Sequence, residues 1–168
     1  ALEVNAVLTS CDLSGNSIWV KGAKVLASAL EVNGVLTKLN LDGFELNIAQ
    51  LKGIDPVKML NLSNKGLGLA SGIVIAKCLE VNAVLTELRL GGNGFGDSGA
   101  IAIGEALKVN RVLTTLVLGF NNIGDKGAKA MASALEVNAV LTKLDLGRQV
   151  EVLQGLRWQG PIKDQGAI

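Results

Sequence analysis

An eight-residue phrase, LEVNAVLT, occurs three times without change, at 2–9, 79–86 and 135–142. Two close variants, LEVNGVLT and LKVNRVLT, stand at 30–37 and 107–114. The five phrases start 28, 49, 28 and 28 residues apart, and 49 is 28 plus 21. A fixed period of this length indicates units that each pack against their neighbours. The chain is therefore predicted to form a solenoid, with one further, shortened unit inside the long interval.

The first half of each unit follows the pattern Leu-x-x-Leu-x-Leu-x-x-Asn and predicts a short strand. The pattern is clearest in two copies: Leu85, Leu88, Leu90 and Asn93, then Leu113, Leu116, Leu118 and Asn121. Alternation buries Leu88 and Leu90 on one face and leaves Glu87, Arg89 and Gly91 on the other. We expect the Asn side chain to satisfy backbone groups where the chain leaves the strand.

The second half predicts a helix with an apolar inner face. That face follows helical spacing in two copies: Ala100, Ile103, Gly104 and Leu107, then Ala128, Met131, Ala132 and Leu135. Asp97 and Asp125 are predicted N-caps. Asn82, Asn110 and Asn138 are predicted to end their helices in the left-handed conformation.

These strand and helix motifs together resemble a known family. The stretch LTTLVLGFNNIGDKGAKAMASALEVNAVLTKLDLG is similar to the leucine-rich repeats of the ribonuclease-inhibitor type, and the resemblance covers residues 1 to about 148. It implies an α/β horseshoe with parallel strands on the concave face and helices on the convex face. It also implies a protein-binding role, as in ribonuclease inhibitor, the Ran GTPase-activating protein and the sensing regions of NOD-like receptors.

Two departures from the repeat shape the predicted domain organisation, which is a single solenoid over 1–168 with about six units. The unit from Leu36 is short, with Phe44 in the Asn position, so we expect a thinner helix layer there. Residues 149–168 are predicted to be a degenerate or truncated last repeat, or a cap. Since uncapped ends expose apolar surface, we expect another copy of the chain to cover at least one end, in a homodimer through the solenoid ends or a segment exchange. The alternative is a fragment of a longer horseshoe.

Composition excludes several functional classes. Sixteen basic and fifteen acidic residues without a basic stripe argue against nucleic acid, and no apolar run is long enough for a bilayer. The absence of His removes the commonest general base and metal ligand. Cys11 and Cys78 are predicted to be small buried hydrophobic residues in a reduced, cytoplasmic protein. We predict no cofactor, no metal and no enzymatic activity.

Two short motifs resemble catalytic or nucleotide sites. Gly94–Gly99 fits G-x-G-x-x-G, but its glycines are this unit's copies of positions that recur in the next unit. GDSG at 96–99 resembles a serine-peptidase nucleophile motif, which a chain without His cannot use in a Ser-His-Asp triad. Both are attributed to the repeat.

The predicted binding site is the exposed side of the strands on the concave face. Its candidate residues are Met59, Asn61, Glu87, Arg89, Thr115, Val117, Phe120, Lys143 and Asp145. Apolar and Arg side chains at exposed positions are typical of protein interfaces. We therefore predict binding of a protein partner. The alternatives are regulation of a small GTPase, an assembly element without a separate ligand, and a strand face that is merely polar and solvated.

Overall fold

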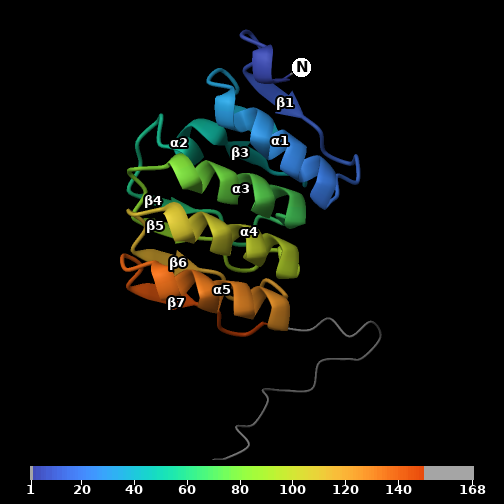
Figure 1. The fold of residues 1–168 in the computed structure, drawn as a ribbon. Helices are drawn as coiled ribbons and strands as arrows, with labels where there is room; N and C mark the ends of the chain where they lie inside the picture. Colours follow the sequence, from blue (N-terminus) through green and yellow to red (C-terminus); the bar gives the residue numbers. More distant parts are fainter. Residues whose placement is uncertain (1, 150–168) are drawn as a thin grey trace, which may run out of the picture.

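The computed structural model describes residues 2–149, which form a layer of helices stacked beside a layer of short strands (Figure 1). The strands are β1 (Ser10–Asp12), β2 (Lys38–Asn40), β3 (Glu45–Asn47), β4 (Met59–Asn61), β5 (Glu87–Arg89), β6 (Thr115–Val117) and β7 (Lys143–Asp145). The helices are η1 (Leu2–Val4), α1 (Val20–Val32), α2 (Ile48–Lys52), α3 (Leu69–Val81), α4 (Gly96–Val109) and α5 (Asp125–Val137).

The strands form two sheets, ordered β1-β2-β3 and β4-β5-β6-β7. All pairs in the second sheet are parallel and in repeat register, so that Leu88 lies opposite Leu116, which lies opposite Leu144. The parallel arrangement predicted from the repeats is confirmed there. In the first sheet β3 runs antiparallel to β2, which the repeat pattern did not predict.

The antiparallel strand comes from the short unit. Its chain turns back after β2, continues into the five-residue helix α2, and ends that helix at Gly53 in the left-handed conformation (φ 77°). The Asn47 side chain caps α2 by accepting a hydrogen bond from the backbone N–H of Gln50 at 3.0 Å. The predicted thinning of the helix layer is confirmed, and α1 packs directly against α3 beside the short helix.

The hydrophobic core lies between the two layers. Leu88 and Leu116 are fully buried, as the strand alternation predicts. Phe95 is also buried, and it occupies space beside two glycines. A Cβ atom on Gly99 would lie 2.7 Å from Cβ of Phe95, and one on Gly72 would lie 3.0 Å from its ring. Small residues are therefore required where neighbouring helices meet around this ring.

The phrase that recurs along the chain joins each helix to the next strand, and its Asn has a different role from the predicted one. The left-handed ending was wrong: Asn82, Asn110 and Asn138 have φ values of −73°, −67° and −91°. All three are buried. Their side chains instead connect one unit to the preceding one, and an extended backbone directs them inward.

Asn110 shows the full pattern of these bonds. Its Nδ2 donates to the carbonyl oxygens of Leu79 and Asn82, at 2.8 and 3.0 Å, in the preceding phrase. Its Oδ1 accepts from the backbone N–H groups of Val112 and Leu113, at 3.0 and 2.8 Å, in its own loop. One carboxamide thus shapes a loop and binds it to its neighbour, which satisfies four buried backbone groups.

The predicted N-caps were also wrong: neither Asp97 nor Asp125 stands at the N-cap, and Asp97 acts on the next helix instead. Gly124, not Asp125, stands at the N-cap of α5, without a side-chain cap of its own. Oδ1 of Asp97, at the start of α4, accepts from the N–H groups of Gly124 and Gly127 at 2.9 and 2.7 Å. A carboxylate at this point satisfies open donors and complements the positive end of the helix dipole.

The predicted inner face is correct for α4 but not for α5. Ala100, Ile103 and Leu107 are fully buried in α4. In α5 only Met131 of the predicted set is buried, while Ala128, Ala132 and Leu135 are exposed. The difference is positional: α5 covers the flank of α4, and no described helix covers the same flank of α5. The last repeat or cap predicted for 149–168 lies outside the described residues, apart from Gln149.

The Asn bonds generate a stability prediction. Asn110→Ala should lower the free energy of unfolding by at least about 2 kcal/mol, because it leaves buried donors and acceptors unpaired. Urea unfolding followed by circular dichroism measures the change. Lys129→Ala, on the exposed side of α5, is the control and should change it by less than about 0.5 kcal/mol. Equal midpoints for the two variants would contradict this role of Asn110.

Candidate functional site: the strand face

The strand face is the side of β4–β7 that points away from the helices. Two rows of side chains cross it, because parallel strands in repeat register align equivalent residues. The first row runs Met59, Glu87, Thr115, Lys143, and the second Asn61, Arg89, Val117, Asp145. All the candidate residues on the strands therefore lie on one sheet. The corresponding residues of β1 and β2 lie on the other sheet, beyond β3.

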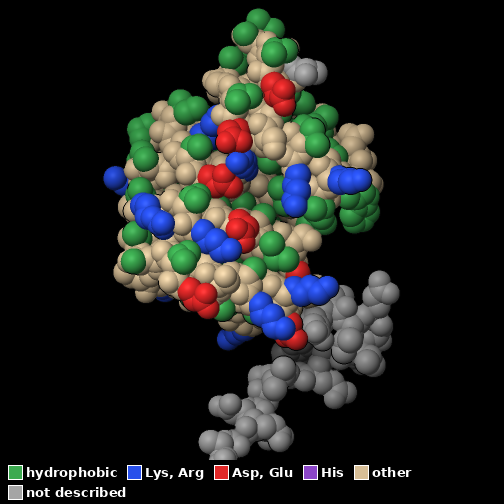
Figure 2. All heavy atoms as spheres, in the orientation of Figure 1, with side chains coloured by type: hydrophobic (Ala, Val, Ile, Leu, Met, Phe, Trp, Pro, Cys, Tyr) green, Lys and Arg blue, Asp and Glu red, His purple; other side chains and the backbone are tan. Residues whose placement is uncertain are grey.

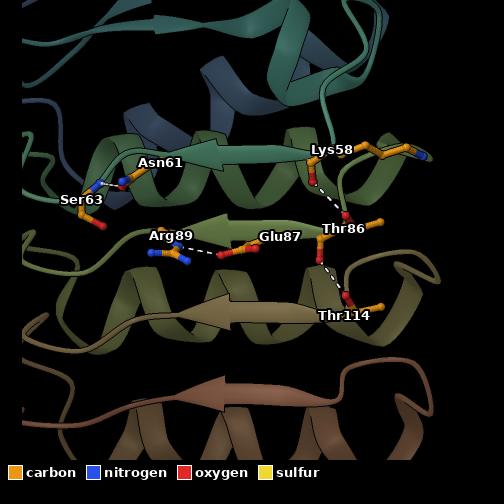
Figure 3. Close-up of polar contacts among 7 residues, drawn as sticks. All are labelled: Lys58, Asn61, Ser63, Thr86, Glu87, Arg89 and Thr114. Carbon is orange, nitrogen blue, oxygen red and sulfur yellow. Dashed lines mark hydrogen bonds and ion pairs between the residues drawn. The ribbon is translucent and has the colours of Figure 1, made fainter.

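The centre of the strand face contains an ion pair (Figure 3). Nε of Arg89 lies 2.6 Å from Oε1 of Glu87, two residues earlier on the same strand. Both side chains are partly exposed, so the pair adds little to stability. The ion pair holds the Arg89 guanidinium along β5, and the side chain of Arg89 stays about half exposed.

The sheet is also fastened at the start of each strand. Oγ1 of Thr86 donates to the carbonyl of Lys58 at 2.9 Å, and Oγ1 of Thr114 donates to that of Thr86 at 3.0 Å (Figure 3). These threonines end the recurring phrase. The strand face is therefore held at a fixed register by residues that do not themselves lie on it.

Phe120 is the most unusual residue at the edge of this face. It is half exposed and lies in the left-handed conformation, with φ of 58°. A bulky side chain is a genuine outlier there. The equivalent positions in the two preceding units carry Asn64 and Gly92, also at positive φ, which are residue types that tolerate it.

Arg148 completes the cluster; its place beside the strand columns follows from the sequence, although it was not among the candidate residues. It lies one repeat after Phe120, also at positive φ (54°), and its guanidinium carbon is 5.7 Å from the centre of the Phe120 ring. This distance suits a cation–π contact. The sequence signal was the 28-residue spacing, which puts the two residues in one column. Phe120 and Arg148 thus both adopt a strained, left-handed backbone at equivalent positions of successive units, although neither is glycine.

Met59 supplies a second apolar area on the same sheet. Its side chain is 54% exposed on β4, whereas Val117 on β6 is half-buried. Exposed Met and Phe beside Arg match the composition of interface anchors. Two clefts of about 490 and 370 Å³ lie away from the strand face, the first at the start of α1 and α3, the second between α1, α3 and α4.

The glycine N–H groups of the motif at 94–99 are not available to bind a phosphate. The N–H groups of Gly94, Gly96 and Gly99 donate to the carbonyls of Leu67, Asn121 and Phe95, at 2.6, 2.9 and 3.1 Å. A phosphate loop needs such donors pointing at a ligand. Within residues 2–149, no group of three or more Asp, Glu or Cys side chains could hold a metal ion.

The two cysteines differ in environment. Cys78 is buried in α3, and loss of solvation, the main cause, raises the pKa of its thiol from 9.0 to about 12. The prediction of a buried cysteine is confirmed for this residue. It was wrong for Cys11, which is half-buried on β1 at the end of the first sheet, where no described strand covers its outer edge.

The pKa of Cys78 leads to a pH prediction. Below about pH 9 its thiol is neutral in both folded and unfolded chains; between pH 9 and 12 only the unfolded chain ionises, so stability falls as pH rises. The urea midpoint should therefore decline less steeply with pH in Cys78→Ala, because this variant has no thiol at that position to ionise. Ala is the suitable replacement, since it occupies the equivalent positions in α1, α4 and α5. Parallel declines would contradict the assignment. At neutral pH a thiol reagent should label Cys11 first.

The helix side gives no sign of a polyanion site. Figure 2 shows Lys, Arg, Asp and Glu side chains interspersed over the face in view. Such mixing does not produce the basic stripe that nucleic acids require. Among the described helices, none has the length and apolar character needed to cross a membrane.

Comparison with known proteins agrees with the repeat geometry. Residues 81–104 and 109–132 each match the Leucine Rich repeat family. The fold is a leucine-rich-repeat solenoid. A solved structure, "Leiomodin-1 Actin-Binding Site 2 (ABS2)", is similar over 84% of this chain and 72% of its own, with 24% identity and a TM-score of 0.49. No curated protein matches the sequence.

The conformation of Phe120 can be tested through stability. Phe120→Gly should be more stable than Phe120→Ala by about 1 kcal/mol, because Gly adopts positive φ without the Cβ penalty. Urea unfolding of both variants measures the difference. At an ordinary exposed position an Ala variant is more stable than a Gly variant. A Phe120→Ala variant that is as stable as Phe120→Gly, or more stable, would therefore exclude the left-handed conformation.

Proposed function

We propose that this leucine-rich-repeat chain is a non-enzymatic binding module whose partner is a protein that docks on the strand face. The observation that carries the proposal is the Phe120–Arg148 pair. Asn or Gly would adopt the left-handed conformation of Phe120 at a lower cost, although neither could make the ring's contact with Arg148. The retention of Phe120 is explained if its ring contacts a partner.

The surroundings of this pair support a macromolecular partner. Met59, Val117 and Phe120 offer separated apolar contacts. Arg89 on β5, between Met59 and Val117, and Lys143 on β7 offer hydrogen-bond donors. Such an alternation over several strands suits an extended surface better than a small molecule. The rigid register of β4–β7 means that little conformational entropy is lost on binding.

Two alternatives remain distinct in what they predict. If the chain regulates a small GTPase, adding it to purified GTPases should change the rate of nucleotide hydrolysis, and the strand-face variants should abolish the change. If it is an assembly element without a separate ligand, the same variants should be silent. We further propose a reducing, cytoplasmic location, which the two unpaired thiols support.

The test is affinity capture from a lysate of the source organism with matched variants. Phe120→Asn should weaken capture of the partner roughly tenfold or more, as truncation of an interface anchor does. Asn is chosen because Asn64 shows that it is compatible with the backbone of this column. Val117→Thr tests the neighbouring strand with little change in shape.

Two exposed helix-side substitutions, Lys24→Ala and Lys129→Ala, are the controls and should leave capture unchanged. A partner that is lost with the helix-side variants but retained with both strand-face variants would move the site to the helices. Melting curves for all four variants separate loss of binding from loss of fold.

A further inference from the structure

The cleft of about 490 Å³ at the start of α1 and α3 lies beside the short unit. The five-residue helix of that unit, α2, packs where α1 and α3 finish (Figure 1). There Nζ of Lys52 donates to the carbonyl of Leu30 in α1, and Nδ2 of Asn82, directly after α3, donates to that of Leu51. The starts of α1 and α3 therefore have no intervening helix, and the cleft between them has the volume of an ordinary ligand site.

Two residues that line this cleft depart from the repeat. Trp19 stands at the N-cap of α1, where α3 and α5 have Gly68 and Gly124, and its side chain is 70% exposed. Asp42 directly follows the second leucine of its strand pattern, a position that holds Ser or Gly in the other units. An exposed aromatic ring and a carboxylate thus occur together at one cleft, and neither is a copy of a repeated residue.

The fold uses one oxygen of the Asp42 carboxylate and leaves the other free. Oδ2 accepts from the backbone N–H groups of Gly68 and Ser71 at the start of α3, at 2.9 and 3.1 Å. Oδ1 receives no hydrogen bond from the described residues. A Cβ atom on Gly68 would lie 3.0 Å from this Oδ1, so glycine is what lets the carboxylate come so close. Asp42 therefore caps α3 and still has an unused acceptor.

The charge of this carboxylate is not neutralised within the described part of the chain. Among residues 2–149, Asp42 is the only charged residue that lines the cleft, and none of the ion pairs there includes it. Lys65 is close in sequence to the lining residue Gly66, but its Nζ lies 5.3 Å from the centre of the Phe44 ring. The apolar part of the wall is formed by Ile18, Trp19, Leu41 and Leu69.

This combination suits an ammonium group on an apolar stem. An ammonium has three donors and no acceptor, and the face of an aromatic ring attracts it. A guanidinium is bound best by both oxygens of a carboxylate, but Oδ2 of Asp42 already accepts two N–H groups. A lysine side chain needs only the free Oδ1 for its charge, while its methylene stem can lie against Trp19 and Ile18.

We propose that this cleft binds a lysine side chain of a protein partner. The ammonium donates to Oδ1 of Asp42, and the stem packs against the ring of Trp19. Because Trp19 is largely exposed, a side chain carried by a large molecule can reach the ring. The cleft lies away from the strand face, and the proposal does not depend on binding there.

NMR of the ¹⁵N-labelled chain tests the proposal with a capped Ala-Lys-Ala peptide as the probe. The signal is the indole N–H of Trp19, which a Trp158→Phe variant identifies because the chain has two tryptophans. The lysine peptide should shift this signal in a saturable titration. A norleucine peptide, which keeps the stem without the ammonium, should not shift it, and an arginine peptide should bind severalfold more weakly.

A pair of aspartate variants separates binding from helix capping. Asp42→Asn keeps an oxygen for the two N–H donors of α3 but removes the charge, and it should weaken binding of the lysine peptide by about tenfold or more. Asp97→Asn is the matched control, because Asp97 accepts from the N–H groups of Gly124 and Gly127 in the same way, away from the cleft. Binding by this control should be unchanged.

Two more variants complete the set. Trp19→Gly, which introduces the residue found at the equivalent positions, should weaken binding roughly two- to fivefold, followed through the backbone N–H signals of Gly43 and Gly66 in the cleft wall. Phe120→Asn should bind the peptide like the wild type, so that failure of this site and failure of the strand face are distinguishable. Melting curves confirm that each variant folds.

Four results would overturn the proposal. They are a lysine peptide that causes no saturable shift at millimolar concentration, an arginine or norleucine peptide that binds as tightly, and equal losses in Asp42→Asn and Asp97→Asn. The fourth is free n-butylammonium that binds more tightly than the lysine peptide, which would assign the cleft to a small amine instead of a protein side chain.

Discussion

The buried carboxamide of each recurring phrase is the interaction on which the rest of the structure depends. A strand of three residues has too few backbone bonds to fix its own register, and a helix of thirteen has no fixed rotation without neighbours. Asn110 lies where the two elements meet, binds the preceding unit through two hydrogen bonds and shapes its own loop through two more. The position of each strand then follows from that of the one before.

Asn93 and Asn121 do the same at the other end of β5 and β6. Nδ2 of Asn121 donates to the carbonyls of Leu90 and Leu118, at 2.9 and 3.0 Å, so that it joins two successive strands where they turn toward their helices. Gln149 replaces Asn one repeat later and reaches Leu118 and Leu146 with its longer side chain. The short unit has Phe44 at this position, which cannot donate.

The period, the strand–helix alternation and the buried leucines could be predicted from the sequence, because each follows from spacing alone. The roles of Asn110 and Asp97 could not. A polar residue at a helix end looks like a cap for its own helix, and only the stacking distance between units shows that it reaches the neighbour. The antiparallel β3 was also beyond the pattern, since it occurs where the repeat is interrupted. The alignment of the candidate residues on one sheet and the place of Arg148 beside them followed from the period, whereas the left-handed backbone of Phe120 and Arg148 did not.

The same logic separates the parts of a unit that can vary from those that cannot. Asn110 and Thr114 are fixed by side-chain hydrogen bonds to the preceding phrase. The Glu87 side chain bonds to Arg89 on its own strand, and Val117 has no polar side-chain group. Phe120 lies between these cases, because its backbone follows the column of Asn64 and Gly92 while its side chain contradicts that column's preference. A residue that costs local stability and lies half exposed beside Arg148 is most simply understood through what it contacts outside the chain. Binding specificity would then reside at positions such as Phe120 that depart from the repeat pattern, on a scaffold that the recurring phrase holds rigid.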